Sequence, residues 1–270
     1  MVVRGWRWGA ALCCLLLAGC VGKLPRTAAL SSDEEQQAKA RWAQLQRARQ
    51  PVAVDGDFRL RWDVLGSKGG IDAVLQMQKP AQLRFSANDP LGRPLILAVS
   101  DGSRFTYVDN RAGQVYQGAT TAKFWRRYVP EAVQPSDLFY YLGGLIDGQQ
   151  AAAVQPARDE DGQGIWYSWR DNHALQHHVL LDAQGSRLER HLLFDRRGEE
   201  ILEVRYSGAV HKAGAEAGNA LTWPEKIELR GEAVSGTVEV QTQKIYDFAV
   251  RGAAVFQLTP PPAFFVEQVD

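Results

Sequence analysis

Apolar and polar residues alternate with a period of two through most of this chain of 270 residues. The pattern is plain at Phe58, Leu60 and Trp62, which are separated by charged residues, and it resumes after each short turn. An alternation of this kind predicts consecutive antiparallel strands that share one apolar face. We therefore expect a mainly β protein with a single antiparallel sheet of roughly ten strands and a few helices.

Turn sequences separate the expected strands of the second half. Asp-x-x-Gly segments begin at Asp159, Asp182 and Asp195, and Asp at the start with Gly at the end is typical of a type I turn. The run Pro260-Pro261-Pro262 predicts an irregular tail, because proline lacks the N–H that regular structure needs.

A single sheet of roughly ten strands cannot bury its faces unless it curls. A curled sheet with one apolar face and few helices to fill it predicts a concave, partly covered hydrophobic cavity. An error of one residue in register would reverse the side on which the lining residues lie. The residues expected to line this cavity are Phe58, Leu60, Trp62, Leu75, Met77, Leu83, Phe85, Leu95 and Leu97.

Three helices are expected, one before the strands and two that interrupt them. Ser31 and Ser32 each stand three residues before a Glu, which is the spacing of a capping box, so a helix is expected from there to about residue 50. A second helix is expected over residues 120–129. A third is expected over residues 137–142, with Ser136 as its N-cap and Gly143-Gly144 at its end.

Composition excludes several classes of function. The 31 basic and 31 acidic side chains balance, so the chain offers no electrostatic footprint for nucleic acid. The three cysteines are Cys13, Cys14 and Cys20, so the remainder of the chain has no disulfide, no cysteine metal ligand and no thiol nucleophile. The sequence also lacks the phosphate-binding, dinucleotide-binding, serine-hydrolase and zinc-protease motifs.

Four histidines lie close together in the sequence, at His173, His177, His178 and His191. His177 and His178 are adjacent in an expected strand, so their side chains should point to opposite faces of the sheet. That placement argues against a metal cluster. We expect no metal, no cofactor and no enzymatic activity.

The amino terminus reads as a targeting segment. Arg4 and Arg7 precede an apolar run over residues 8–19, which is shorter than the about 20 residues that a membrane-spanning helix needs. The run ends in Leu17-Ala18-Gly19-Cys20, which resembles the lipobox of bacterial lipoprotein precursors. This resemblance implies cleavage before Cys20 and acylation of that residue, and Val21 in place of Asp implies the outer membrane.

These features suggest three parts of the chain. Residues 1–19 form the expected lipoprotein signal peptide, residues 20–30 the lipid anchor and tether, and residues 31–270 a single folded domain.

A more specific pattern lies within residues 81–144. The strand around Phe85 leads into Asp89-Pro90-Leu91-Gly92, and a short helix runs from Pro135-Ser136-Asp137-Leu138 into Leu142-Gly143. The order and spacing of these segments resemble the outer-membrane lipoprotein receptor family LolB. The lipobox and the opening helix fit the same family, and the final strands resemble the wider LolA/LolB-like fold.

The resemblance implies an unclosed antiparallel β-barrel with a helical lid over a hydrophobic cavity that holds acyl chains. It also implies a monomeric, lipid-anchored, periplasm-facing receptor that takes lipoproteins from a soluble LolA-like carrier and places them in the outer membrane. In the family, the Leu of the Pro-Leu-Gly loop protrudes and is needed for transfer to the membrane. Here that loop is Pro90, Leu91 and Gly92.

Two departures keep a second interpretation open. The chain has extra sequence around residues 150–165 and 209–221, and Tyr140 and Tyr141 stand where the family tends to have Trp. The alternative is an envelope assembly or sensing protein that has the same fold and does not carry lipoproteins.

Overall fold

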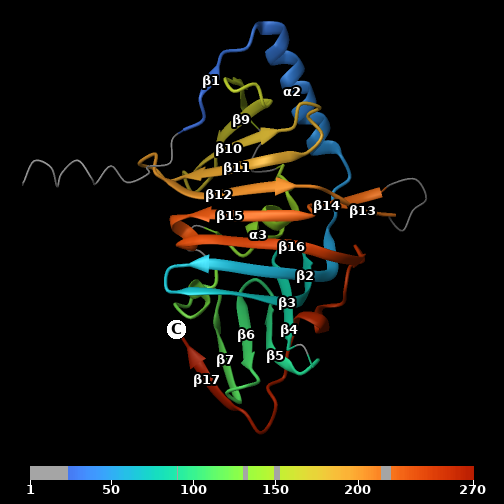
Figure 1. Ribbon diagram of the computed structural model, residues 1–270, viewed down its shortest axis with the longest axis vertical. Helices are drawn as coiled ribbons and strands as arrows, with labels where there is room; N and C mark the ends of the chain where they lie inside the picture. The colour runs from blue at the N-terminus through green and yellow to red at the C-terminus, as the bar shows by residue number, and fades with distance from the viewer. Residues whose placement is uncertain (1–23, 90, 130–132, 149–152, 214–219) are drawn as a thin grey trace, which may run out of the picture.

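The computed structural model of the protein describes residues 24–270 except 90, 130–132, 149–152 and 214–219 (Figure 1). Its helical elements are α2 (Ser32–Arg47), η2 (Trp125–Arg127), α3 (Asp137–Gly143), η3 (Glu232–Val234) and η4 (Ala253–Phe256). The strands of the first half are β1 (Thr27–Ala28), β2 (Ala53–Val64), β3 (Ser67–Gln78), β4 (Gln82–Asn88), β5 (Pro94–Ser100), β6 (Arg104–Asp109) and β7 (Gln114–Ala119). Those of the second half are β8 (Gln155–Asp159), β9 (Ile165–Arg170), β10 (Gln176–Leu181), β11 (Leu188–Phe194), β12 (Glu200–Ser207), β13 (Val210–Ala213), β14 (Ala220–Trp223), β15 (Lys226–Gly231), β16 (Gly236–Asp247) and β17 (Phe265–Val269).

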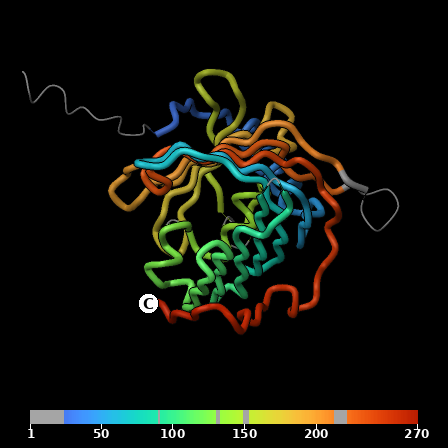
Figure 2. The backbone as a smooth tube through the Cα atoms, turned by 60° about the horizontal axis from the view of Figure 1, so that its bottom comes forward, coloured from blue at the N-terminus to red at the C-terminus, as the bar shows by residue number. Residues whose placement is uncertain are grey.

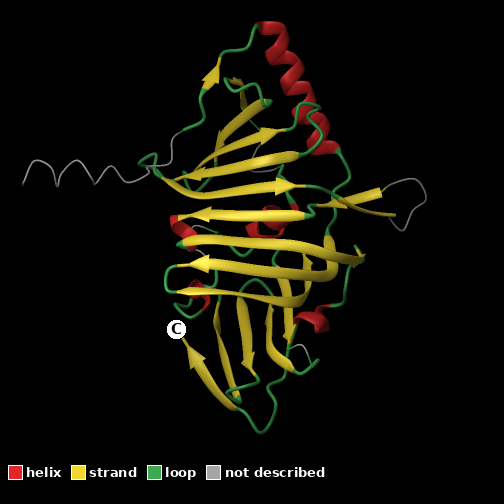
Figure 3. Ribbon diagram, viewed as in Figure 1, coloured by secondary structure: helices red, strands yellow, loops and turns green. Residues whose placement is uncertain are grey.

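Fifteen of these strands form one sheet in the order β1-β8-β9-β10-β11-β12-β15-β16-β2-β3-β4-β5-β6-β7-β17. Neighbouring strands are antiparallel except that β17 runs parallel to β7. The sheet is not closed, since β1 and β17 are its two edges in the described part of the chain. The prediction of a mainly β protein with an unclosed sheet is confirmed, and Figure 3 shows how little of the chain is helical.

The sheet has more strands than expected because several are very short. β1 has 2 residues, and β8 and β17 have 5 each, so none shows a useful alternation. β13 and β14, of 4 residues each, pair with one another in a separate two-stranded sheet. β17 also lies in the Pro-rich tail, where irregular structure was predicted. It forms because it pairs with β7 along its whole length. Phe265 N also donates to the carbonyl of Gly113, just before β7, at 3.0 Å.

The sheet curls so that one face is concave. Figure 2 shows the strands arching around the segment that contains α3. We call this concave side the inner face, and its side chains include Phe58, Leu75 and Val204, which pack into one core with Phe139 of α3. The opposite, outer face carries charged pairs such as Arg59 and Asp72.

Helix α2 begins as the sequence predicts. Ser31 and Glu34 form the capping box, with the Ser31 N–H donating to Glu34 Oε2 at 2.9 Å. The helix ends at Arg47 and packs on β9, where the ring of Trp42 stacks on Tyr167 at a centroid distance of 4.7 Å. Tyr167 also donates its hydroxyl hydrogen to the carbonyl of Ala38 at 3.0 Å. The helix therefore covers the end of the sheet that is formed by β8 and β9.

The prediction of a helix over residues 120–129 is wrong. The structure has turns there and only the short η2, because Thr120 Oγ1 donates to Gly102 O at 3.0 Å and holds the segment on the β5–β6 turn. The rings of Phe124 and Trp125 pack on Phe105 at 5.6 and 5.3 Å. Burial of these rings fixes the backbone together with a few helical hydrogen bonds, such as that from Arg126 N to Ala122 O at 3.1 Å.

Helix α3 confirms the third expected helix, with one correction. Ser136 makes no side-chain capping bond; the Asp137 carboxylate instead accepts from Gln134 N at 3.1 Å. Gly144 closes the helix in the left-handed conformation with φ of 59°, as its position predicts.

The three Asp-x-x-Gly turns are present. In each, the glycine N–H donates to the carbonyl oxygen of the aspartate three residues earlier, at 2.8–3.2 Å. The carboxylates support the same turns, since Asp182 Oδ1 accepts from Ser186 N at 2.7 Å.

Residues 248–264 connect β16 to β17 and cover part of the outer face. Arg251 fixes the start of this connection with ion pairs to Asp55 at 3.0 Å and Asp247 at 2.7 Å. Arg84 of β4 donates to Val255 O at 3.1 Å, and Phe256 is buried. The tail thus completes the packing of the first half-sheet.

We expect Trp42→Ala to lower the free energy of unfolding by about 3–5 kcal/mol, since it removes a fully buried ring that holds α2 on the sheet. Urea denaturation of the purified chain measures this. Gln44→Ala, an exposed position on the same helix, is the matched control and should change stability by no more than about 0.5 kcal/mol. A loss below about 1 kcal/mol for Trp42→Ala would contradict the assignment of α2 to the cooperative fold.

Candidate functional site

Seven of the nine predicted lining residues lie on the inner face. Strand pairing sets Leu75 opposite Phe85 and Met77 opposite Leu83, and Phe58, Leu60 and Trp62 follow at alternate positions of β2. Phe58, Leu75 and Met77 are buried. Leu60, Leu83 and Phe85 are partly buried and pack against the same core, and half-buried Trp62 donates Nε1–H to Ser67 Oγ at 3.0 Å.

The prediction that all nine share one face is wrong for Leu95 and Leu97. Leu97 pairs with Ser86 and with Val108, so these side chains lie on the outer face. The cause is a register shift between Ala87 and Asn88 at the end of β4, which the alternation of apolar residues does not reveal.

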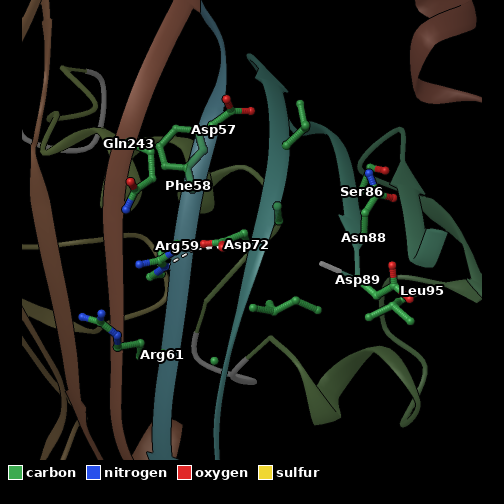
Figure 4. A pocket seen from close by; sticks show the side chains of 14 residues that line it. Asp57, Phe58, Arg59, Arg61, Asp72, Ser86, Asn88, Asp89, Leu95 and Gln243 are labelled. Atoms are coloured by element: carbon green, nitrogen blue, oxygen red, sulfur yellow. Dashed lines mark hydrogen bonds and ion pairs between the residues drawn. The ribbon is translucent and has the colours of Figure 1, made fainter. Parts of the chain in front are cut away.

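Leu95 lies beside a charged pocket on the outer face with a volume of about 790 Å³. Figure 4 shows Arg59 and Asp72 pointing toward one another across β2 and β3, with Nε and Oδ1 at 2.7 Å. Asp57 and Arg61 add two further charges. These charged side chains share the lining with apolar residues such as Val74 and Leu95.

Helix α3 and the η2 segment cover the inner face. Phe139 of α3 is 1% exposed and meets Trp223 edge-on at 5.5 Å. Lys79, in the β3–β4 turn, places Nζ over the ring of Tyr140 at 4.4 Å. Burial lowers the pKa of Lys79, which is about half-buried between these rings. Aromatic side chains therefore fill the space between sheet and cover.

A second pocket opens where α2 and α3 end, with a volume of about 650 Å³. We call it the mouth pocket. No pattern in the sequence indicates it, because its walls come from segments far apart in the chain. Charged and polar residues, among them Arg49, Asp182 and Glu189, form part of its lining. Its larger apolar lining residues are Leu45, Pro51, Leu145, Ile146, Leu188, Tyr206, Trp223 and Pro224.

The double glycine at the end of α3 lets the helix lie directly on this pocket. A Cβ atom at Gly143 would stand 3.1 Å from the ring of Trp223, and one at Gly144 would stand 3.3 Å from the ring of Tyr206. Either contact is tighter than side chains normally make. The glycines were expected as a helix end, and the structure adds this close approach.

Three histidines are buried, and the pair His177 and His178 points to opposite faces as predicted. On the inner face His177 Nδ1 lies 2.9 Å from His191 Nε2, and His177 Nε2 lies 3.3 Å from Asp171 Oδ2. On the outer face His178 Nδ1 lies 2.7 Å from Ser168 Oγ. Among the described residues, no group of three His, Cys, Asp or Glu side chains is arranged to hold a metal ion.

Burial keeps these imidazoles neutral. It lowers the pKa of His177, against a smaller opposing effect of Asp171, and lowers the pKa of His178 to about 4. It lowers the pKa of His191 well below the ordinary value, with the nearby His177 and His178 adding to the effect. Tyr141 of α3 lies 5.1 Å from the His191 ring, so the neutral pair forms part of the floor under the helical cover.

The predicted membrane-transfer loop is a tight turn whose Leu91 is 78% exposed. Asp89 Oδ1 accepts from the N–H groups of Leu91 and Arg93, each at 2.9 Å, and Asp89 Oδ2 accepts from Arg93 Nε at 2.6 Å. These hydrogen bonds lower the pKa of Asp89, and the bond from the Arg93 backbone has the largest effect. Gly92 has φ of 78° and donates to Asp89 O at 2.9 Å.

The role of this loop in membrane transfer stays a prediction. Pro90 lies outside the described residues, as does the predicted lipidation site Cys20. No helix among the described residues is long and apolar enough to cross a membrane.

Comparison with known proteins identifies the fold. A LolA superfamily protein from Nitrosomonas europaea superposes with a TM-score of 0.51 at 9% sequence identity, covering 83% of this chain and 97% of that chain. A DUF1329 family protein from Desulfovibrio piger also gives a TM-score of 0.51, at 8% identity and the same coverage of 83% and 97%. No family model matches the chain. No curated protein matches it either. The chain therefore has a LolA-like fold.

The buried imidazoles predict a pH dependence of stability. Their folded pKa values lie below the ordinary 6.5, so the unfolded chain binds more protons as the pH falls through that value. We expect the free energy of unfolding to fall from pH 7 to pH 5, as measured by urea titrations across this range. His178→Asn should reduce the slope of the free energy of unfolding against pH by up to the equivalent of about one proton. The exposed His173→Asn is the control, and a flat profile for the unsubstituted chain would contradict neutral burial.

Proposed function

We propose that this protein is held at the outer membrane by acylated Cys20, faces the periplasm, and binds acyl chains of lipoproteins or other lipids under its helical cover. The observation that carries the proposal is a strongly curled sheet with one apolar face, wrapped around a short helix that ends in two glycines. A surface of this kind takes up hydrocarbon once the cover moves aside. Binding would replace contacts between aromatic side chains by contacts with methylene groups.

The geometry supports uptake through the mouth pocket. It is the pocket that lies against both α2 and α3, and its walls include Leu45, Ile146 and Leu188. Movement of α3 at Gly144 would extend this pocket toward Phe139 and the inner face. Burial of each methylene there contributes about 0.8 kcal/mol, so a long acyl chain can offset the loss of the contacts made by α3.

We further propose that the protein works as a LolB-type receptor, which accepts lipoproteins from a LolA-like periplasmic carrier. The Asp89 turn supports this step, because it presents Leu91 to solvent on a backbone fixed by hydrogen bonds. A rigid apolar tip next to Arg93 suits contact with a membrane surface.

One observation favours a second candidate function. Phe58, Phe139 and Trp223 are each 1% exposed, so the interior is filled without a ligand. A filled interior suits an envelope assembly or sensing protein that binds a protein partner and carries no lipid. Lipid mass spectrometry of the mature protein purified from the envelope separates the two, since stoichiometric acyl species beyond its own anchor support the first and their absence supports the second.

The first prediction concerns the anchor. We expect Cys20→Ala to block processing and to remove the protein from the outer-membrane fraction, because the sulfur is the site of acylation and an anchor of several chains binds a membrane far more tightly than one exposed side chain. Fractionation and mass analysis of the amino terminus measure both effects. Cys14→Ala is the matched control and should be processed normally. Normal processing and fractionation of Cys20→Ala would contradict the lipoprotein assignment.

The second prediction concerns Leu91. Leu91→Glu should leave stability within about 0.5 kcal/mol, because the side chain is exposed, yet should abolish delivery of lipoproteins from carrier to membrane. A reconstituted transfer assay with vesicles measures delivery. Leu65→Glu is the matched control, since Leu65 is 91% exposed in the β2–β3 turn.

Unfolding of the Leu91→Glu variant would show that the loop is part of the core. Transfer at the normal rate by a folded Leu91→Glu variant would remove the support that this loop gives to the receptor proposal.

A further inference from the structure

Two buried hydrogen-bond donors at the mouth pocket have no partner among the described residues. Tyr206 Oη and Trp223 Nε1 are both buried and unbonded, and their side chains are 9% and 1% exposed. Both residues line the mouth pocket. Buried polar groups in proteins nearly always have a partner, so two unbonded donors on residues of one pocket indicate a missing acceptor.

The described residues around the two donors provide no bonded acceptor. The apolar side chains of Leu45, Ile146 and Leu188 form part of the pocket wall. The polar residues of the lining, such as Asp182 and Glu189, make no hydrogen bond to either donor. The carbonyl oxygen of Pro224, the residue after Trp223, already accepts from Thr242 Oγ1 at 2.7 Å. No described residue supplies an acceptor to the two donors, so a ligand or water is the source that we consider.

The chemistry of the two groups limits the class of ligand that they can bind. An indole N–H donates and cannot accept, and a tyrosine hydroxyl donates readily at neutral pH. Burial raises the pKa of Tyr206 further, so its proton stays in place. Two donors beside the apolar side chains of this mixed lining fit an oxygen acceptor that is attached directly to hydrocarbon.

We propose that Tyr206 and Trp223 form a polar subsite that binds the carbonyl oxygen of a fatty-acyl group whose chain runs under α3. The inference rests on the proposed lipid-binding function and adds to it the part of the ligand that is recognised. A pure hydrocarbon slides freely in an apolar cavity, whereas a bound carbonyl fixes where the chain begins.

Helix α3 controls access to this subsite. Its last residues touch the rings of both Tyr206 and Trp223, because Gly143 and Gly144 carry no side chain. The left-handed Gly144 is the point at which the chain leaves the helix. Movement there uncovers both donors together and opens the pocket toward Phe139.

The test uses the full mature chain in nanodiscs made of ether-linked phosphatidylcholine, so that the bilayer holds no acyl carbonyl. The probe is palmitic acid labelled with ¹³C at its carboxyl carbon. Separate arms use a phosphatidylglycerol and a tripalmitoyl-cysteinyl peptide labelled at the acyl carbonyls, which distinguish the sources of the acyl group. Affinity is measured above empty nanodiscs, and isotope-edited infrared spectra report hydrogen bonding to the labelled carbonyl.

We expect Tyr206→Phe and Trp223→Phe each to weaken binding of the preferred acyl compound by about tenfold, the effect of one buried hydrogen bond. The carbonyl band should shift toward its position without hydrogen bonding. Without ligand, Tyr206→Phe should melt no lower than the unsubstituted protein, since it removes an unpaired hydroxyl. Trp125→Phe is the matched control, because Trp125 Nε1 is also buried and unbonded but Trp125 does not line the mouth pocket.

The outcomes separate the two proposals. Equal affinity and an unchanged carbonyl band in both variants would overturn the subsite and leave the lipid-binding function standing. Binding of none of the labelled compounds by the unsubstituted protein would overturn both. A fall in the melting temperature of ligand-free Tyr206→Phe of more than about 4 °C would show that the hydroxyl already has a partner in the protein, and would overturn the subsite.

Discussion

The pairing of β16 with β2 joins the two halves of this protein into one sheet. Each strand has 12 residues, and they pair from Gly236 and Val64 to Asp247 and Asp55. Without this ladder, the strands β2–β7 and the strands β8–β15 would be two separate meanders. Val240 of β16 lies opposite Leu60 of β2, so the inner face continues across the join and one core serves both halves. Gly56 of β2 pairs with Ile245 of β16, next to a register shift. A Cβ at Gly56 would stand 2.4 Å from Lys244 O, so the glycine permits the two strands to come this close.

The inner face is well packed but not wholly apolar. Most of it is apolar and buried, but it includes the His177–His191 pair and several unbonded donors beneath α3. Each unbonded donor destabilises the folded chain by about 1–3 kcal/mol relative to a satisfied one. A sequence shaped by packing alone would replace Tyr206 by Phe. Retention of such groups beside a pocket and two glycines is the pattern that a binding site leaves in an otherwise well-packed core.

Local signals in the sequence predicted local structure well. The capping box at Ser31, the turns at Asp159, Asp182 and Asp195 and the end of α3 at Gly144 depend on residues within a few positions of one another. The inner position of Phe58, Leu75 and Phe85 followed from alternation within strands. By contrast, the side of Leu97 depends on a register shift in β4, and the turns at 120–129 depend on Phe105 from another strand. The lining of the mouth pocket comes from five segments that are far apart in the chain, so no local pattern in the sequence indicates it.

The proposed anchor and Leu91 differ greatly in the free energy of membrane binding that each can contribute. If Cys20 carries acyl chains, one chain of palmitoyl length contributes about 12 kcal/mol of burial, at about 0.8 kcal/mol for each methylene. Insertion of the Leu91 side chain contributes only about 1.5–3 kcal/mol. Leu91 is therefore too weak to hold the protein on a membrane, and a contact of this strength forms and breaks quickly. Because Asp89 already fixes the turn, insertion of Leu91 loses little conformational entropy. A permanent anchor with a weak, preorganised second contact suits repeated approach to the bilayer, which delivery of one lipid after another requires.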